Sequence, residues 1–228
     1  MSVVDQTFQP VNLAELCVVI NLDDRPDRLE SFQRSVLKNT SERKHPLPDL
    51  ITPVLRLAGS TGELPRFQNC TRSHIRALRL LKEKLKTPLS WGLIFEDDAE
   101  RQRGHVDVAS YQAVELALKH SDVRVIMLGM NASVRDQSLE TWSETGYTGL
   151  QKVRSAYCGT AYLVRRDYCG AVIECFERGH KRQMQLDVAW LALQAQDLWL
   201  GLKPGWFTQR SGWSDNEQRH VSYHHVMA

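Results

Sequence analysis

The sequence predicts an α/β fold in a single domain, and three observations support this prediction. The chain has 228 residues, a length typical of one large α/β domain. Short apolar runs at residues 17–20 and 92–95 have the length and composition of buried strands. Several such runs are followed by stretches with apolar residues every three or four positions, which indicates helices that pack on a sheet.

The composition excludes several classes of protein. Hydrophobic residues make up 42% of the chain and charged residues 25%, and a net charge of +2 does not by itself indicate a nucleic-acid or membrane partner. The five cysteines form no Cys-x-x-Cys pair, so neither a disulfide framework nor a zinc knuckle is supported. Without a signal-like or membrane-spanning stretch, we expect a cytoplasmic single domain over 1–228, with 1–12 and 216–228 as flexible tails.

The first predicted unit is a strand at 17–20 followed by a helix at 26–37. Pro26 suits the first turn of that helix and Asp24 is the expected cap. Its core-facing residues are expected to be Leu29, Phe32, Val36 and Leu37. Arg25 and Arg28, near the helix start, could hold a nucleotide, or they could pair with neighbouring aspartates at the surface.

A second strand is predicted at Val54–Ala58 and a second helix begins after Cys70. Its apolar residues recur at helical spacing up to Leu85, and Thr71 is its expected cap. The first turn would then present Ser73 and His74 beside free backbone N–H groups, a site for phosphate or hydroxyl groups. The alternative is that His74 is structural.

The central prediction concerns an acidic stretch directly after the strand at 92–95. Glu96, Asp97, Asp98 and Glu100 lie where this strand should leave its sheet, which is the edge where α/β proteins bind ligands. Carboxylates at that edge repel one another unless a cation or a ligand shares the site. Mg²⁺ or Mn²⁺ would fit, together with a phosphorylated substrate. The alternative is a solvated turn.

The second half of the chain continues the pattern. Strands are predicted at 123–128, 157–164 and 198–200, and helices at 108–120, 166–178 and 185–196. Asp107 is the expected cap of the helix at 108–120, and Gly159 allows close backbone approach. The polar stretch 132–150 is a candidate for a mobile flap over a site.

Five motifs in order resemble glycosyltransferase family 25, which includes lipopolysaccharide and collagen galactosyltransferases. The first is Asn-Leu-Asp-Asp-Arg-Pro-Asp-Arg-Leu at 21–29, and the second is the 70–81 stretch with its Ser-His-Ile-Arg-Ala core. The others are Leu-Ile-Phe-Glu-Asp-Asp-Ala at 93–99, Gly-Thr-Ala-Tyr-Leu at 159–163, and the 209–215 segment. Together they cover nearly the whole chain.

The resemblance implies a GT-A-like (Rossmann-like) glycosyltransferase fold with a mixed, mostly parallel central sheet. It also implies an inverting transfer from a nucleotide-sugar donor, usually a UDP-sugar, to an acceptor hydroxyl on a saccharide such as lipopolysaccharide. Mn²⁺ or Mg²⁺ would be held by Asp98 with Glu96. A histidine near the C-terminus, His224 or His225, could complete the metal shell, and the alternative is that both belong to a disordered or tag-like tail.

The same resemblance suggests roles for further residues. Asn21, Arg25 and Arg28 would hold the nucleotide, and Ser73 and His74 the sugar or phosphates. Glu96 or Asp97 would hold the ribose or a water on the metal, and Asp187 would be the catalytic base. The alternative for Asp187 is a carboxylate that only stabilises the start of its helix.

Two other functions remain open at this point. The same core could glycosylate a hydroxymethylated base in DNA, with phosphates held by Arg72, Arg76, Arg79, Lys82, Lys84 and Lys86. These six residues could equally form a solvated helix face. The chain could also be a non-catalytic relative that binds a nucleotide or a partner protein.

Overall fold

A mixed β-sheet forms the centre of the molecule. The structure is a computed structural model and describes residues 12–37, 53–102, 106–132 and 139–222. Its eight-stranded sheet has the order β2-β1-β3-β8-β5-β9-β7-β6. These strands are β1 (Leu16–Asn21), β2 (Val54–Ala58), β3 (Trp91–Glu96), β5 (Val123–Asn131), β6 (Leu139–Thr141), β7 (Leu150–Val153), β8 (Tyr157–Arg165) and β9 (Leu198–Leu202).

Most strands of this sheet run in one direction. β1 pairs in parallel with β2 and β3, and β5 pairs in parallel with β9. β8 lies antiparallel between β3 and β5, and β7 lies antiparallel between β9 and β6. The predicted α/β class with a mixed sheet is therefore confirmed.

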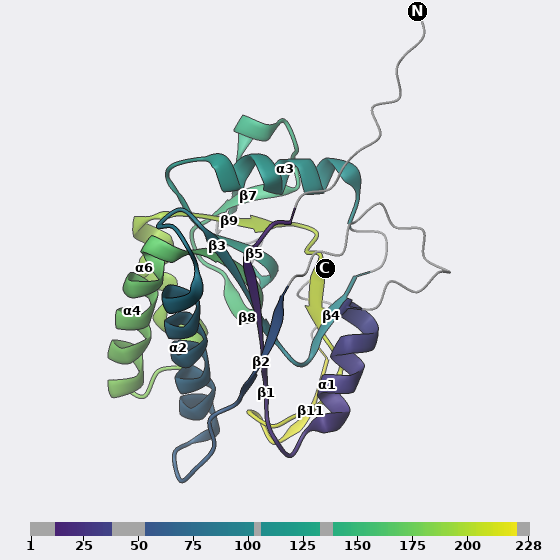
Figure 1. Cartoon of the computed structure of the whole chain (residues 1–228), viewed down its shortest axis with the longest axis vertical. Coiled ribbons are helices and arrows are strands. Elements are labelled where there is room, and N and C mark those ends of the chain that lie inside the picture. Colours follow the sequence, from purple (N-terminus) through teal and green to yellow (C-terminus); the bar gives the residue numbers. More distant parts are fainter. Residues whose placement is uncertain (1–11, 38–52, 103–105, 133–138, 223–228) are drawn as a thin grey trace, which may run out of the picture.

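Helices cover both faces of the sheet (Figure 1). One face carries α1 (Pro26–Phe32), a π-helical segment (Gln33–Leu37) and α3 (Val108–Lys119). The other carries α2 (Arg66–Lys84), α4 (Cys169–Lys181), α5 (Leu186–Ala189) and α6 (Leu191–Gln196). Strand residues alternate between the two cores: in β1, Val19 belongs to the first core and Val18 to the second. Within the described residues, no helix combines the length and the apolar character needed to cross a membrane.

The predicted strands at 17–20, Val54–Ala58 and 92–95 are found, as is the helix after Pro26. Phe32 and Val36 are buried in the core as expected. Asp24, however, does not cap the helix, because Arg25 occupies the cap position and makes no side-chain capping bond. Asp24 instead lies within a turn closed by a hydrogen bond from the Arg25 N–H to the Leu22 carbonyl.

The second helix begins earlier than predicted. α2 begins at Arg66, after Pro65, so Thr71 lies inside it and donates a hydrogen bond to the Phe67 carbonyl instead of capping. The backbone N–H groups of Ser73 and His74 therefore bond within the helix, and the predicted phosphate site at a helix start is wrong. Apolar periodicity reveals only the part of a helix whose apolar residues face the core. The first turn of α2 is mostly polar and lacks this periodicity, so the sequence pattern does not indicate where the helix begins.

The second half follows the predictions with two differences. α3 is capped by Asp107, as expected, through reciprocal bonds with Ser110. The helix predicted at 185–196 is divided at Trp190 into α5 and α6. In the predicted flap, residues 139–141 form an edge strand and Trp142 is buried in the core, while 133–138 lie outside the described residues. The described part is thus a sheet edge and not a flap.

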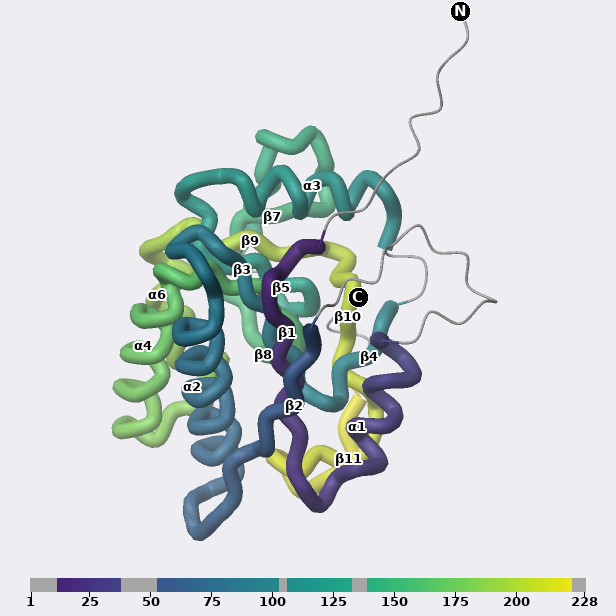
Figure 2. Tube along the Cα trace, viewed as in Figure 1, coloured from purple at the N-terminus to yellow at the C-terminus, as the bar shows by residue number. Residues whose placement is uncertain are grey.

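The C-terminal segment forms two small antiparallel pairs. β10 (Phe207–Gln209) pairs with β4 (Ala99–Arg101), and the two run side by side in Figure 2. β11 (Gly212–Ser214) pairs with β12 (Arg219–Val221), and we call this pair the C-terminal hairpin. Residues 216–222 therefore belong to a structured hairpin and not to the tail expected from the sequence.

Candidate active site

A cleft of about 660 Å³ opens at the carboxyl ends of β1 and β3. Because β8 is antiparallel to β3, its first residues lie at the same edge of the sheet. The loop after β2, the first half of α2, the start of α5 and the C-terminal hairpin complete the walls. Of the acidic stretch after β3, Glu96, Asp97 and Asp98 therefore line a cleft instead of forming a solvated turn, whereas Glu100 lies in β4.

Asp98 has a carboxylate that is only partly satisfied. Its Oδ2 accepts a hydrogen bond from Gln209 Nε2 at 2.8 Å, while its Oδ1 is buried without a hydrogen-bond partner among the described residues. Burial, together with the charges of Glu96 and Asp97, raises the pKa of Asp98 to about 7. The nearest guanidinium nitrogen of Arg28 is 4.0 Å away. This site therefore favours a proton or a cation.

Asp97 is more fully paired. It is buried, and it accepts hydrogen bonds from Asn21 Nδ2 at 2.7 Å and from Arg28 Nη1 at 3.4 Å. Burial raises its pKa despite these partners. Asn21 is itself buried and accepts a bond from Arg56 Nε at 2.9 Å. The Asn21–Asp97 hydrogen bond thus joins the ends of β1 and β3. Asn21 does not line the cleft itself but holds Asp97, which does.

Glu96 is held by two residues of α2. Its Oε1 lies 3.1 Å from His74 Nε2 and 3.6 Å from Cys70 Sγ, and its Oε2 accepts from Thr160 at 3.5 Å. Burial alone would raise the pKa of Glu96, but the hydrogen bonds from His74 and Cys70 lower it below its ordinary value. Burial and the charge of Glu96 raise the pKa of the Cys70 thiol well above its usual range. His74 is fully buried, and its Nδ1 is 3.0 Å from the Tyr162 hydroxyl.

Ser73 lines the cleft, but its hydroxyl is used within the fold. It donates to the Asn69 carbonyl at 2.8 Å and accepts from the Ser60 backbone N–H at 2.7 Å. Its role in this structure is to hold the loop after β2 against α2. The predicted contact of Ser73 with a sugar or phosphate stays a prediction.

Asp187 lies in the first turn of α5 and lines the same cleft as Glu96 and Asp98. Burial raises its pKa, the backbone N–H of Cys158 opposes this by a hydrogen bond, and the charge of Glu96 adds to the rise. Gly159 allows the close approach predicted for it, since a Cβ there would stand 3.2 Å from His74 Cε1. Tertiary folding therefore places a carboxylate some 90 residues from the acidic stretch in one site with it.

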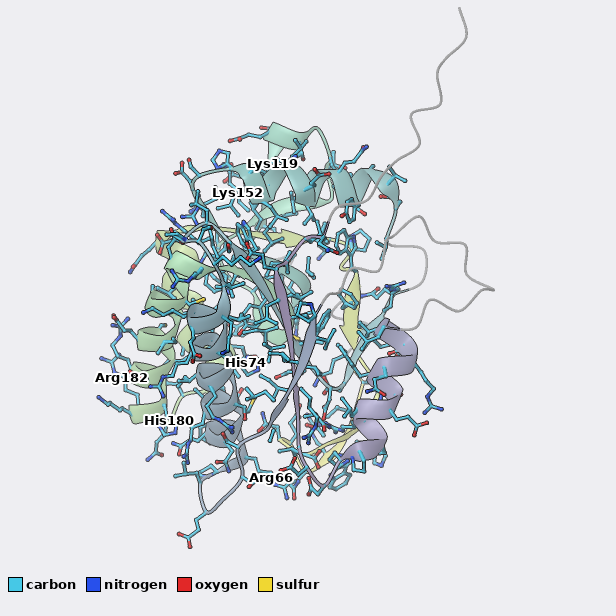
Figure 3. The ribbon with its side chains drawn as sticks, in the orientation of Figure 1. Arg66, His74, Lys119, Lys152, His180 and Arg182 are labelled. Carbon is cyan, nitrogen blue, oxygen red and sulfur yellow. The ribbon has the colours of Figure 1, made fainter. Side chains whose placement is uncertain are left out.

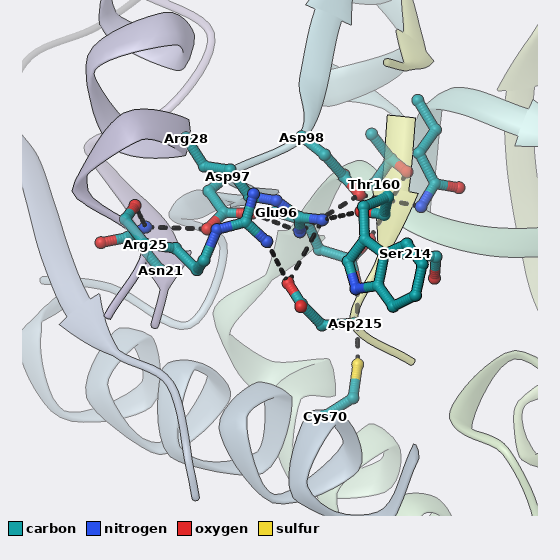
Figure 4. A network of polar contacts seen from close by, with 12 residues as sticks. Asn21, Arg25, Arg28, Cys70, Glu96, Asp97, Asp98, Thr160, Ser214 and Asp215 are labelled. Atoms are coloured by element: carbon teal, nitrogen blue, oxygen red, sulfur yellow. Dashed lines mark hydrogen bonds and ion pairs between the residues drawn. The ribbon is translucent and has the colours of Figure 1, made fainter. Parts of the chain in front are cut away.

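Arginines at the beginnings of α1 and α2 converge on one carboxylate of the C-terminal hairpin. Figure 4 shows two of them, Arg25 and Arg28, beside Asp215. Asp215 lies 2.5 Å from Arg25 Nη1, 3.3 Å from Arg28 Nη2 and 3.6 Å from Arg66 Nη1. Arg28 also donates to the Trp213 carbonyl. Figure 3 shows Arg66 near the beginning of α2, with His74 further along the same helix. Sequence reasoning assigned no role to Arg66 because it placed the start of α2 too late.

The structure brings most of the predicted residues together. Arg28, Ser73, His74, Glu96, Asp97, Asp98 and Asp187 all line the cleft. Asn21 and Arg25 lie directly behind it, bonded to Asp97 and Asp215. His224 and His225 lie outside the described residues. Of the basic residues on α2, Arg76 donates to the Ala58 carbonyl and Arg79 pairs with Glu177.

The fold and the site thus define a mixed α/β protein with an acidic, arginine-flanked cleft at the carboxyl edge of its sheet. No protein-family profile and no curated protein sequence matches the chain. Among solved structures, it is similar to mannose-1-phosphate geranyltransferase from Thermus thermophilus, with a TM-score of 0.41 and 9% sequence identity. The match covers 82% of this chain and 72% of that chain, and likeness at this level identifies neither a family nor an activity.

Proposed function

We propose that this chain is a metal-dependent, inverting glycosyltransferase with a GT-A-like fold. It would transfer a sugar from a UDP-sugar to a hydroxyl of an acceptor saccharide such as lipopolysaccharide, as its resemblance to family 25 implies. The observation that carries the proposal is the buried Oδ1 of Asp98, which has no hydrogen-bond partner in the described part of the chain and lies in a cleft that Asp187 also lines.

The residues present fit a hard divalent cation. Mn²⁺ and Mg²⁺ prefer oxygen ligands, and Asp98 offers a buried carboxylate oxygen that lacks a partner among the described residues. Asp97 is less suitable because Asn21 and Arg28 already occupy its oxygens. Asp98, with Glu96 beside it, would therefore hold the ion. The bound cation would supply Lewis-acid stabilisation of the leaving diphosphate.

The arginines around Asp215 supply a site for the diphosphate of the donor. A guanidinium group bonds phosphate and carboxylate oxygens in the same way, so a diphosphate could replace Asp215 against Arg25, Arg28 and Arg66. Arg28 also contacts Asp97, so its guanidinium group joins the diphosphate site to the acidic residues after β3. The predicted donor-binding roles of Arg25 and Arg28 thus gain support, and Arg66 joins them.

Asp187 would act as the base. In an inverting transfer the acceptor oxygen forms a bond to the anomeric carbon while the bond from that carbon to the diphosphate oxygen breaks. The electron pair of the broken bond leaves with the diphosphate, and the acceptor hydroxyl proton passes to the Asp187 carboxylate. A pKa raised by burial makes this carboxylate a better proton acceptor.

The test is release of UDP from a panel of UDP-sugars, with and without a saccharide acceptor. We expect slow UDP release that EDTA abolishes and Mn²⁺ restores, and that Asp98→Ala removes. Asp122→Asn, which changes an exposed acid in the turn before β5, is the matched control and should keep full activity. UDP release that survives both EDTA and Asp98→Ala would contradict the proposal.

A further inference from the structure

Three side chains of different chemistry form a second cluster on the α2 side of the cleft. Cys70 Sγ, His74 Nε2 and a Glu96 carboxylate oxygen all lie within 4.8 Å of one another. Cys70 and His74 are four residues apart on α2, so their side chains share one face of the helix. Glu96, the last residue of β3, meets them from the sheet.

The spacing of these atoms suits a tetrahedral zinc ion. Zn²⁺ binds sulfur at about 2.3 Å and nitrogen or oxygen at about 2.0–2.2 Å, which puts neighbouring ligand atoms roughly 3.3–3.6 Å apart. Glu96 Oε1 lies 3.1 Å from His74 Nε2 and 3.6 Å from Cys70 Sγ. Only small side-chain movements are therefore needed to admit the ion.

The surroundings orient the cluster as they do in metal sites. The hydroxyl of Tyr162 lies 3.0 Å from Nδ1 of His74, which leaves Nε2 directed at Glu96. Thr160 donates to the other oxygen of Glu96. The three candidate ligands also line the cleft, so a fourth coordination position would open towards it.

We propose that Cys70, His74 and Glu96 bind one Zn²⁺ ion, whose fourth position accepts water or an anionic group of a ligand in the cleft. A thiolate and an imidazole select zinc over magnesium or manganese, so this site differs in chemistry from the position at Asp98. Glu96 is a ligand of the proposed zinc ion and also lies beside Asp98, but the zinc site does not depend on the proposed glycosyl transfer. Its test uses metal binding alone.

The experiment titrates chelator-treated full-length protein with Co²⁺, which replaces Zn²⁺ and gives a sulfur-to-cobalt charge-transfer band only when a thiolate is a ligand. We expect a band that saturates at one equivalent and disappears when Zn²⁺ is added. Cys70→Ser should lose the band. Cys158→Ser should keep it, because this second thiol of the cleft bonds to Thr160 and lies outside the cluster. Absence of the band in the wild type, or its loss in Cys158→Ser alone, overturns the proposal.

Variants at the other positions keep the test decisive if Cys70→Ser does not fold. Glu96→Gln retains the thiolate and should weaken Zn²⁺ binding by about 100-fold, measured by competition with a chromogenic chelator. Tyr162→Phe, which releases His74 Nδ1, should weaken it by about 10-fold. Folding of each variant is verified by near-ultraviolet circular dichroism. Equal Zn²⁺ affinity in the wild type and in folded Glu96→Gln overturns the proposal.

Discussion

Asp98 is a residue whose ionised carboxylate lowers the stability of the metal-free fold at the place where we propose a cation binds. Its carboxylate is buried beside Glu96 and Asp97, and one of its oxygens has no partner among the described residues. Because its pKa is raised from 3.8 to about 7, the folded state binds this proton more tightly than the unfolded state does. The stability that this proton provides is therefore complete below about pH 4 and is lost as the pH rises through 7.

Asp98→Asn should consequently stabilise the metal-free protein at pH 8. The amide removes a buried charge that repels its neighbours, so we expect a gain of about 1–3 kcal/mol in the free energy of unfolding. At pH 5 the wild-type carboxyl is already protonated, and the difference should fall below about 1 kcal/mol. Urea unfolding at the two pH values measures this. A variant that is less stable than the wild type at pH 8, with Asp122→Asn unchanged, would show that Asp98 is not under strain.

The substitution Asp187→Asn tests the proposed role of Asp187 as the catalytic base. A base acts mainly in the transition state, so kcat should fall by about 10²–10⁴-fold while UDP affinity stays within severalfold. Burial raises the pKa of Asp187, so the acid side of the wild-type pH profile should lie above the ordinary range for aspartate, with activity falling as the pH is lowered. Initial rates over a pH series, with calorimetry for UDP, give both quantities. Full turnover in this variant would exclude the role.

At the scale of elements, the position at which α2 begins determines which of its polar groups face the cleft. Its apolar spacing correctly predicts an end before Pro88, but its beginning at Arg66 is hidden in a polar turn. The six-residue difference between the predicted cap, Thr71, and the observed cap, Pro65, takes Ser73 and His74 away from the helix start. It also brings Arg66 to the Arg25 and Arg28 side of the cleft, where all three meet Asp215.

The C-terminal hairpin should control access of anions to these arginines. Asp215→Asn removes the carboxylate that neutralises them, so UDP should bind about 3- to 10-fold more tightly, as calorimetry at low salt would measure. The lost ion pairs should cost roughly 1 kcal/mol of stability, since Asp215 is partly exposed. Glu177→Gln, which removes a carboxylate paired with Arg79 away from the residues that line the cleft, is the matched control. Weaker UDP binding in Asp215→Asn would mean that the arginines do not bind phosphate.

At the scale of the whole molecule, the sheet topology assembles the site. β8 runs antiparallel beside β3, and this brings residues 157–160 and the start of α5 to the edge where β1 and β3 end. The C-terminal part of the chain also reaches this edge, because β10 pairs with β4 and places Gln209 within hydrogen-bond distance of Asp98. Segments from the whole length of the chain therefore meet in one cleft.

Ligand-linked stability tests this assembly as a unit. UDP and Mn²⁺ added together should raise the melting temperature by about 5–10 °C at a hundredfold excess over Kd, since a ligand of the native state stabilises by about 2.7 kcal/mol there. Each alone should have a smaller effect, because the cation and the diphosphate neutralise each other in the cleft. Strictly additive shifts, or equal shifts in Asp98→Ala, would contradict a shared site.

The sequence by itself determined six of the eight strands of the main sheet, the cap of α3 and the acidic edge, because these depend on local apolar spacing, caps and the point where charge follows a strand. The tertiary structure decided what each polar group can do. Asp97 and Ser73 are already bonded, Asp98 keeps an oxygen unpartnered among the described residues, and Cys70 and His74 meet Glu96. Such pairings depend on strand order and on helix register in space, which apolar periodicity along a single chain does not encode.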